Sequence, residues 1–357
     1  MLEKQRVHLI AIADLAPPIQ GISIVTHWIL EQLSSFDFKI RVINTTVNKN
    51  IFYKIKRTYK FLVTFFKLLF TKNFSILYIP LGHGESLLFQ IMFVYLGYLK
   101  KKRVIVHHHS YLPITSPSGI LHKVSHGNLL RKAEHIFLSD KMMTDYLHVW
   151  GKADKNYWVI TNHDVARSRL ISKNRKFHQE NSLTFIHFGN LSLEKGFFDA
   201  VEACEPYLRF DPKSQFKILG GTTNIEILNT IEGLKRKYPN QFTYSDQYTA
   251  ELLQRNLSDS DILLFPSRYK NEASPIVILE AQTKGLFVAA TDIGTISTEV
   301  MHPGFSVQIA NYQDELHKLV QFLLLPDIRN PLQRDIIDKM FRLSLKAQNE
   351  VKEVFAT

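Results

Sequence analysis

Cysteine is almost missing from this sequence of 357 residues, in which Cys204 stands alone. No disulfide can therefore form within the chain, and a reducing cytosol is the compartment that fits such a protein. The first residues, MLEKQRVHLIAIAD, lack the small-residue cleavage site of a signal peptide, because Asp14 follows a short apolar run. We therefore expect a first β-strand there and a cytoplasmic protein. Low-complexity tracts and short-period repeats are also missing, which argues against disordered and solenoid classes.

Long apolar runs and, over one stretch, acidic residues are missing too. Lys67 interrupts the run IFYKIKRTYKFLVTFFKLLF well short of the ~20 residues that a membrane-spanning helix needs, and IMFVYLGYL is shorter still. From Lys39 to Lys72 there are nine lysines and arginines and no acidic residue. Apolar residues recur there at helical spacing, whereas Lys56 and Lys60 lie off that stripe. The stripe consists of Phe52, Ile55, Tyr59, Leu62, Phe66 and Leu69.

The basic segment 49–72 has two interpretations. A basic, aromatic, amphipathic helix is typical of a segment that lies on an anionic membrane surface. Alternatively, the apolar stripe faces the core of the domain and the lysines face solvent. We expect peripheral contact of residues 49–72 with the inner face of the cytoplasmic membrane. The net charge of +11 comes with no recognised nucleic-acid-binding motif, so we expect no nucleic acid partner.

Short β-branched and aromatic runs alternate with longer helical patterns along the chain. Most of these runs are nearly all apolar, as is typical of parallel strands buried on both faces. Their alternation with helices predicts βαβ units in open, doubly wound sheets, and two such series predict two Rossmann-like domains. The expected strands are VHLIAIAD, FKIRVIN, SILYIP, RVIVHHH, HIFLS and YWVIT in the first half, and LTFIHFG, QFKILGG, QFTYSD, DILLFPS and LFVAATD in the second.

The length of the chain also predicts two domains of ~150 residues each. The polar stretch RSRLISKNRKFHQENS, residues 167–182, has neither a strand pattern nor an apolar face, and we place a linker there. We expect a first, acceptor-binding domain at 1–166, a second, nucleotide-sugar-binding domain at 183–335, and a C-terminal helix at 336–357 that packs back on the first domain. Ligands of open α/β sheets bind beyond the carboxyl ends of the strands, so polar residues that end strands are the candidates for a site.

Residues 271–285, NEASPIVILEAQTKG, place one carboxylate before a helix and another inside it. Ser274 is expected to be the N-cap and Pro275 the first helical residue. Glu272 then lies beside the free helix amides, which attract anions, and Glu280 lies about a turn and a half inside. Amides that bind phosphate and carboxylates that accept hydrogen bonds from hydroxyls suit a nucleotide-sugar. From spacing alone, two solvated glutamates remain an open alternative.

The surrounding segments carry a resemblance to a known family. Glu272 and Glu280, with PS upstream and EA at the second glutamate, resemble the Glu-x7-Glu signature of family 4 retaining glycosyltransferases. FIHFGNLSLEKGFFDAVEA resembles the family's strand, Gly-Arg-Leu, Glu-Lys-Gly and helix segment, with Asn190 in place of the arginine. VITNHD, TDIGTISTEV and VHHHS resemble three further family segments. The resemblance implies hexosyltransferase activity and the α/β GT-B fold, in which the parallel sheets of two Rossmann-like domains face each other across a cleft.

The resemblance also implies roles for residues of the second domain. Lys195 is expected to contact the donor diphosphate, because a fixed cation stabilises the negative charge that develops on the leaving group. Glu272 is expected to hold hydroxyls of the donor sugar, and Glu280 those of the ribose. Asn190 can donate hydrogen bonds but brings no charge; Arg268 is a candidate for the missing cation and equally a solvated loop residue. The other donor-side candidates are Gly189, Gly220, Ala273, Ser274 and Ile276, of which Gly220 also suits a plain tight turn.

In the first domain, His109 ends the run RVIVHHH and matches a family histidine near the transferred sugar. Alternating strand side chains place His107 and His109 on one face and His108 on the other, so we expect no three-fold metal coordination from this run. Which of the three faces the ligand stays open. The resemblance implies no metal and no cofactor besides the nucleotide-sugar co-substrate. Gly21 is a candidate for a phosphate or sugar loop, or for a simple strand-to-helix turn.

The function that we expect is retaining transfer of a sugar from a nucleotide-sugar to a lipid-linked saccharide, in bacterial surface-polysaccharide (capsule, O-antigen or lipopolysaccharide) biosynthesis. The catalytic candidates are Glu272, Lys195 and His109. Two alternatives stay open. A nucleotide-sugar epimerase of the same fold would need neither acceptor nor membrane. A non-catalytic, membrane-associated partner subunit would explain the exchange of arginine for Asn190.

Overall fold

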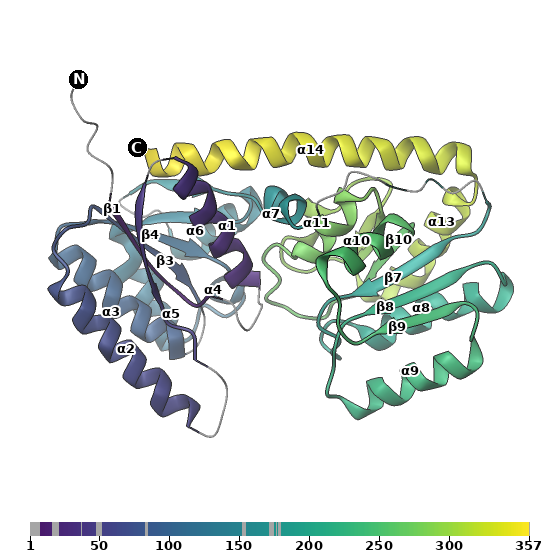
Figure 1. Ribbon diagram of the computed structural model, residues 1–357, viewed down its shortest axis with the longest axis horizontal. Coiled ribbons are helices and arrows are strands. Elements are labelled where there is room, and N and C mark those ends of the chain that lie inside the picture. The colour runs from purple at the N-terminus through teal and green to yellow at the C-terminus, as the bar shows by residue number, and fades with distance from the viewer. Residues whose placement is uncertain are drawn as a thin grey trace. The chain divides into compact units, whose positions relative to one another are not determined.

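The computed structural model describes residues 8–15, 21–36, 38–47, 52–82, 85–151, 155–170, 175, 177 and 180–356 (Figure 1). The chain divides into two compact units: Met1–Asn162 with Lys346–Thr357 form unit 1, and His163–Leu345 forms unit 2. Parts of four predicted segments lie outside the described residues. These are residues 1–7 of the first strand region, 16–20 before Gly21, 49–51 of the basic segment, and 171–174, 176, 178 and 179 of the expected linker.

Unit 1 is built on a six-stranded parallel sheet in the order β2-β1-β3-β4-β5-β6. β1 pairs with β2 from His8 opposite Lys39 to Ala13 opposite Asn44. The strands are β1 (His8–Ala13), β2 (Lys39–Asn44), β3 (Ile76–Leu81), β4 (Arg103–His108), β5 (Glu134–Phe137) and β6 (Tyr157–Val159). The helices are α1 (Gly21–Ser35), α2 (Tyr53–Phe70), α3 (Glu85–Leu99), α4 (Leu112–Thr115), α5 (Ile120–Gly127), the 3-10 helix η1 (Leu129–Lys132) and α6 (Asp140–Trp150).

Unit 2 carries a second six-stranded parallel sheet in the order β12-β11-β10-β7-β8-β9. The strands are β7 (Thr184–Phe188), β8 (Gln215–Leu219), β9 (Phe242–Ser245), β10 (Ile262–Phe265), β11 (Phe287–Thr291) and β12 (Phe305–Val307). The helices are α7 (His163–Ser168), α8 (Phe197–Phe210), α9 (Ile225–Lys237), α10 (Ala250–Ser258), α11 (Ile276–Thr283), α12 (Ile296–Glu299), the 3-10 helix η2 (Ile309–Asn311), α13 (Tyr312–Leu323) and α14 (Pro326–Ala356), whose last residues belong to unit 1.

The predicted fold class, with two parallel doubly wound sheets, is confirmed. Each of the eleven predicted strands overlaps an observed strand. β12 was missed, because its three residues are only half-buried and alternate apolar, polar, apolar without a longer run. In each unit the strand order reverses once, between β1 and β3 in unit 1 and between β7 and β10 in unit 2. Such reversal points are where open α/β sheets bind ligands.

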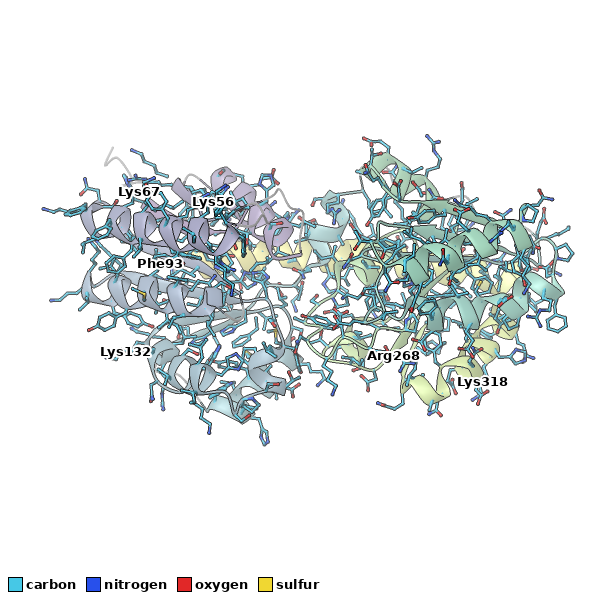
Figure 2. The ribbon with its side chains drawn as sticks, turned by 90° about the horizontal axis from the view of Figure 1, so that it is seen from below. Lys56, Lys67, Phe93, Lys132, Arg268 and Lys318 are labelled. Atoms are coloured by element: carbon cyan, nitrogen blue, oxygen red, sulfur yellow. The ribbon has the colours of Figure 1, made fainter. Side chains whose placement is uncertain are left out.

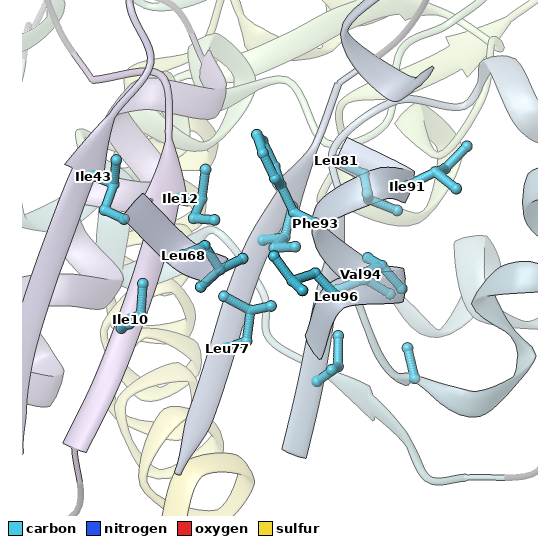
Figure 3. Close-up of a cluster of buried hydrophobic side chains, with 14 of the residues drawn as sticks. Ile10, Ile12, Ile43, Leu68, Leu77, Leu81, Ile91, Phe93, Val94 and Leu96 are labelled. Atoms are coloured by element: carbon cyan, nitrogen blue, oxygen red, sulfur yellow. The ribbon is translucent and has the colours of Figure 1, made fainter. Parts of the chain in front are cut away.

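Helices α2 and α3 lie side by side (Figure 2), and a cluster of buried hydrophobic side chains joins them to one face of the unit 1 sheet (Figure 3). Phe61 of α2 stacks on Phe89 of α3, with ring centroids 4.4 Å apart. The opposite face of the sheet is covered by α1, whose Thr26 lies close to the Tyr78 hydroxyl, and by the end of α14, whose Phe355 packs on the Tyr78 ring. The central strands are thus buried on both faces, as their apolar sequences predict.

The outer side of α2 corrects one of the two interpretations of the basic segment. The helix turns Phe61 and Leu68 toward the sheet and leaves the predicted stripe exposed. The exposed fractions of its residues range from 37% for Leu69 to 70% for Ile55. The interpretation in which this stripe faces the core is therefore wrong. The helix carries apolar residues on two sides, and helical periodicity alone cannot say which side is buried. In the described part of the chain, no helix is long and apolar enough to cross a membrane.

A buried ionic network lies at the start of β10 in unit 2. Asp261 accepts hydrogen bonds from Arg175 at 3.2 Å, from the side chain of Gln333 at 3.2 Å and from the Thr184 backbone N–H at 3.0 Å. The fully buried Arg329 of α14 lies 3.7 Å from the same carboxylate. This network joins the segment before β7 and the start of α14 to the start of β10. β10 is one of the two strands at the reversal point.

Candidate functional site

Three loops follow the two strands at the reversal point of unit 2 and the neighbouring strand β8. They are residues 189–196 after β7, 220–224 after β8 and 266–275 after β10. The first two loops are packed backbone against backbone. Gly220 has a φ of +141°, and a Cβ there would lie 1.8 Å from the Gly189 carbonyl oxygen, so only glycine fits. Gly220 is thus required by the close approach of its loop to the backbone of Gly189.

An ion pair joins the first and third loops. The Lys195 Nζ contacts Glu272 Oε1, and the Ser267 hydroxyl donates to the same oxygen at 2.9 Å. Glu272 is only 6% exposed. The backbone N–H of Arg268 donates to the Glu194 carbonyl at 2.7 Å, which holds the two loops together. A cation and a hydrogen-bonded carboxylate are therefore fixed beside each other above β7 and β10.

Glu280 lies nearby in the sequence but has a different partner. It is 2% exposed within α11, and Arg169, directly after α7, approaches its Oε1 at 2.9 Å. Burial raises the pKa of the Glu280 carboxyl to about 7, and the charge of Arg169 acts against that rise. The pKa of the neighbouring Tyr248 hydroxyl is raised to about 12 by burial and by the charge of Glu280. Arg169, Glu280 and Tyr248 thus form a partly charged cluster.

Two hollows with shared walls open over the carboxyl ends of β7, β8 and β9. One, of about 350 Å³, is lined by residues 190–194 and 222–224. The other, of about 510 Å³, is lined by Asn190, residues 221–223, Leu228, Tyr244, Asp246 and Gln247. Gln247 directly precedes Tyr248 of the Glu280 cluster. The hollows thus adjoin Asn190 and the loop that carries Lys195, and their size suits part of a nucleotide.

The start of α11 differs from the prediction by one residue. Pro275 is the N-cap, with φ −70° and ψ 111°, and the helix begins at Ile276, so Ser274 is not the cap. The Ser274 hydroxyl instead bonds to Glu299, a carboxyl whose pKa burial raises to about 7. Sequence reasoning missed Glu299, although it lies in the late glycine loop that resembled the family. The amide of Ile276 remains at the helix start, where helices have no internal acceptor for it.

One further donor-side candidate, Arg268, has a structural partner, and a glycine that the sequence analysis did not single out, Gly294, packs against the third loop. Arg268 forms a two-pronged ion pair with Asp199 at 2.9 and 2.6 Å, and the arginine side chain is more than half exposed. It therefore points to the rim, not toward Glu272. The Gly294 backbone packs closely against the third loop. Its φ is +59°, and a Cβ at this position would lie 1.9 Å from the Glu272 carbonyl oxygen, so only glycine fits.

The histidines of unit 1 follow the predicted alternation. The rings of His107 and His109 lie 4.1 Å apart, whereas His108 stacks on Phe137 from the other side. His107 bonds to the Tyr78 hydroxyl at 2.8 Å, and His108 to His135 at 2.9 Å, so both are engaged in the core. His109, after the end of β4, keeps a half-buried side chain whose pKa burial lowers to about 3.

Gly21 is the first residue of α1 and has open space where a Cβ would stand. That environment requires no glycine. Within the described residues, no group of three or more His, Cys, Asp or Glu side chains could hold a metal ion.

Comparison with known proteins matches most of unit 2 to one family. Residues 168–339 match the family model described as glycosyl transferases group 1, a range that lies entirely within unit 2. No curated protein matches the chain in a sequence search.

Solved structures resemble the whole chain. Sucrose-phosphate synthase from Thermosynechococcus elongatus has a TM-score of 0.69 at 16% identity, covering 98% of this chain and 100% of that one. HepE of Anabaena in complex with UDP and glucose has a TM-score of 0.67 at 14% identity, covering 98% and 100%. A glycosyltransferase from Rickettsia africae has a TM-score of 0.63 at 13% identity, covering 97% and 99%. At such identities the likeness concerns the fold. The chain thus has the GT-B fold and is a transferase enzyme, and its residues 168–339 match the family of glycosyl transferases group 1.

Proposed function

We propose that this enzyme transfers a sugar, with retention of anomeric configuration, from a nucleotide-sugar to a lipid-linked saccharide in the assembly of a bacterial surface polysaccharide. The observation that carries the donor half of the proposal is the pairing of Lys195 with the buried Glu272, near hollows whose size suits part of a nucleotide. The resemblance of the two loops to family 4 retaining glycosyltransferases supports the retaining outcome. The structure of HepE with UDP-glucose supports a UDP-sugar as the first donor to try.

The donor would be held by four side chains of unit 2. Lys195 would neutralise the charge that develops on the nucleoside diphosphate as it leaves. Glu272, kept in place by Ser267, would accept hydrogen bonds from hydroxyls of the transferred sugar. Glu280 would accept them from the ribose. Asn190 would bring hydrogen bonds only, since it has no charge.

The reaction would take place on one face of the sugar. The bond from the anomeric carbon to the phosphate oxygen breaks, and the acceptor hydroxyl oxygen bonds to that carbon from the same side. The proton of the acceptor hydroxyl moves to the departing phosphate oxygen. No protein nucleophile is needed, so the enzyme would act by orientation and electrostatic stabilisation. His109 is the candidate from unit 1 for contact with the transferred sugar, and Gly21 the candidate for the acceptor-side loop.

The lipid-linked acceptor is supported by the basic segment 49–72, which we propose to contact the cytoplasmic membrane from its inner face. Its apolar stripe is exposed and its lysines have no acidic neighbours in the sequence. A lipid-linked saccharide presents its sugar at such a surface. The expectation of no metal and no further cofactor stays part of the proposal.

The proposal is tested by incubating the protein with radiolabelled UDP- and GDP-sugars, with and without a membrane lipid extract. We expect label to enter the lipid fraction only when the extract is present. Epimerised donor without acceptor would instead favour the epimerase alternative. Donor binding without any turnover would favour the partner-subunit alternative, and transfer to hexose phosphates in place of lipid would contradict the proposed acceptor.

Replacing Arg169 with methionine should weaken UDP binding about tenfold near pH 7 and much less near pH 9. The ribose hydroxyls donate to Glu280, so binding requires the ionised carboxylate. Arg169 holds the pKa of that carboxyl down against burial. Without it the pKa rises above 7, a smaller fraction is ionised near neutral pH, and one pKa unit corresponds to a factor of about ten.

The measurement is the ratio of the UDP dissociation constants of variant and wild type across pH, since this ratio cancels the titration of UDP itself. Glu280→Gln should bind weakly at every pH, because nothing is left to ionise. Arg255→Met, an exposed arginine on α10, is the control and should leave the profile unchanged. Parallel profiles for Arg169→Met and wild type would contradict the assigned pairing.

A further inference from the structure

The outer side of unit 1 carries an apolar surface formed by two helices. α3 has its own exposed stripe, at spacings of four, three and four residues, next to that of α2. We call the combined surface the α2–α3 face. It consists of Phe52, Ile55, Tyr59, Leu62, Phe66, Leu69 and Phe70 at α2, and Leu88, Met92, Tyr95 and Leu99 on α3. Exposed apolar residues scattered singly need no explanation, but eleven gathered on two adjacent helices indicate a binding surface.

The packing of the helices makes this face one surface. α2 and α3 run side by side (Figure 2), and Phe61 stacks on Phe89 between them. The Lys100 ammonium, just after α3, donates to the carbonyls of Leu69 and Thr71 at the end of α2. Both helices turn their buried sides to the same face of the sheet, so both exposed stripes point away from it. Sequence reasoning set aside IMFVYLGYL as too short to span a membrane, and a surface that lies on a membrane does not need that length.

Charge selects the partner. Between Phe38 and Ala133 the sequence has a single acidic residue, Glu85, against nine lysines and arginines up to Lys72 and seven more from Lys100 to Lys132. Lys54, Lys56, Lys67 and Lys72 are exposed along α2 and its end. Figure 2 labels Lys56 and Lys67 on α2. An apolar face flanked almost only by basic charges is complementary to the hydrocarbon boundary and the negative headgroups of an anionic bilayer.

We infer that the α2–α3 face docks in the plane of an anionic bilayer, with the side chains of both helices entering the headgroup boundary. A second copy of this chain fits the face less well, because pairing it with itself would bring lysines against lysines, and like charges across an interface are unfavourable. The inference extends the proposed membrane contact from residues 49–72 to α3. It rests on the proposed function only for the reason why the enzyme would dock, which is access to a lipid-linked acceptor.

The test is sedimentation of the full chain with vesicles, without nucleotide or acceptor. We expect binding to vesicles of equal parts phosphatidylcholine and phosphatidylglycerol, and little binding to phosphatidylcholine alone. The variant Tyr59→Ser/Phe66→Ser/Tyr95→Ser should lose ~100-fold in affinity, because three large apolar side chains no longer enter the boundary. Its matched control, Phe210→Ser/Ile225→Ser, changes two exposed apolar residues of unit 2 and should bind like wild type.

A second pair of variants isolates charge. Lys56→Gln/Lys67→Gln should weaken vesicle binding about tenfold. Lys235→Gln/Lys318→Gln removes the same charge from unit 2 and should not. Equal binding to neutral vesicles, or vesicle binding that survives the serine variant, would overturn the inference. So would a dimer in sedimentation equilibrium that the serine variant dissolves.

The docking and the reaction can fail separately. The serine variant should keep wild-type UDP binding and tryptophan fluorescence, which shows that both units are folded; all three tryptophans, Trp28, Trp150 and Trp158, belong to unit 1. Docking without any sugar transfer would reject the proposed function alone. If the protein transfers sugar to detergent-dispersed lipid but does not bind vesicles, the docking surface alone would be rejected.

Discussion

Lys195→Ala is expected to lower kcat by about 10²–10³-fold, equivalent to about 3–4 kcal/mol of transition-state stabilisation. In the structure the Lys195 ammonium contacts a carboxylate that is almost fully buried, at the end of the strands where the donor diphosphate would leave. Negative charge on that leaving group develops mainly in the transition state, so kcat should fall more than the donor affinity. The measurement is the steady-state rate of label transfer at saturating donor.

Comparison with Glu272 separates a role in transfer from a role in holding the loops. If the pair acts on the donor as a unit, the double variant Lys195→Ala/Glu272→Ala should lose little more activity than either single variant. Lys235→Ala is the matched control, an exposed lysine of unit 2 paired with Glu232, and should stay within about threefold of wild type. A kcat for Lys195→Ala that also stays within threefold, in a protein with unchanged melting temperature, would remove Lys195 from the mechanism.

Much of the fold could be predicted because its strands are buried on both faces. A run such as DILLFPS has almost no interpretation other than a central parallel strand, and β10 lies there. β12 could not be found in this way, since a three-residue edge strand leaves no apolar run. The stripe of α2 was visible in the sequence, but its direction was not. Phe61 and Leu68 compete for the core with six other apolar residues, and the sheet decides between them.

The site was partly visible for a related reason. Lys195, Glu272 and Glu280 stand in motifs whose spacing is local, so the sequence can place each of them on its own loop or helix. That Lys195 pairs with Glu272, 77 residues away, is a tertiary contact that no local pattern encodes. The partner of Glu280 was harder still, because Arg169 lies in a stretch that has no strand or helix pattern and was interpreted as a linker. Glu299 was missed because one carboxylate in a divergent loop carries no periodic signal.

Asp261→Ala is expected to destabilise unit 2 by about 3–5 kcal/mol, the range for breaking a buried ion pair from one side. Asp261 is the only acidic group among the described residues that the structure places in contact with both Arg175 and Arg329. Burial already lowers the pKa of Arg175 to about 10, with the charge of Asp261 acting against that loss. Removing the carboxylate would leave two buried cations that repel each other, and the Thr184 amide without its acceptor.

The two units allow this prediction to be read out separately. Urea unfolding followed by circular dichroism should show an earlier transition for Asp261→Ala, whereas tryptophan fluorescence reports unit 1 alone, because no tryptophan lies in residues 163–345. Glu232→Ala, which breaks the exposed pair with Lys235, should change stability by less than about 1 kcal/mol. Asp261→Asn keeps an acceptor for Thr184 but not the charge, so its loss should fall between the two. A shift below 1 kcal/mol for Asp261→Ala would mean that water or other groups already neutralise both arginines, and the network would then not be what holds α14 to β10.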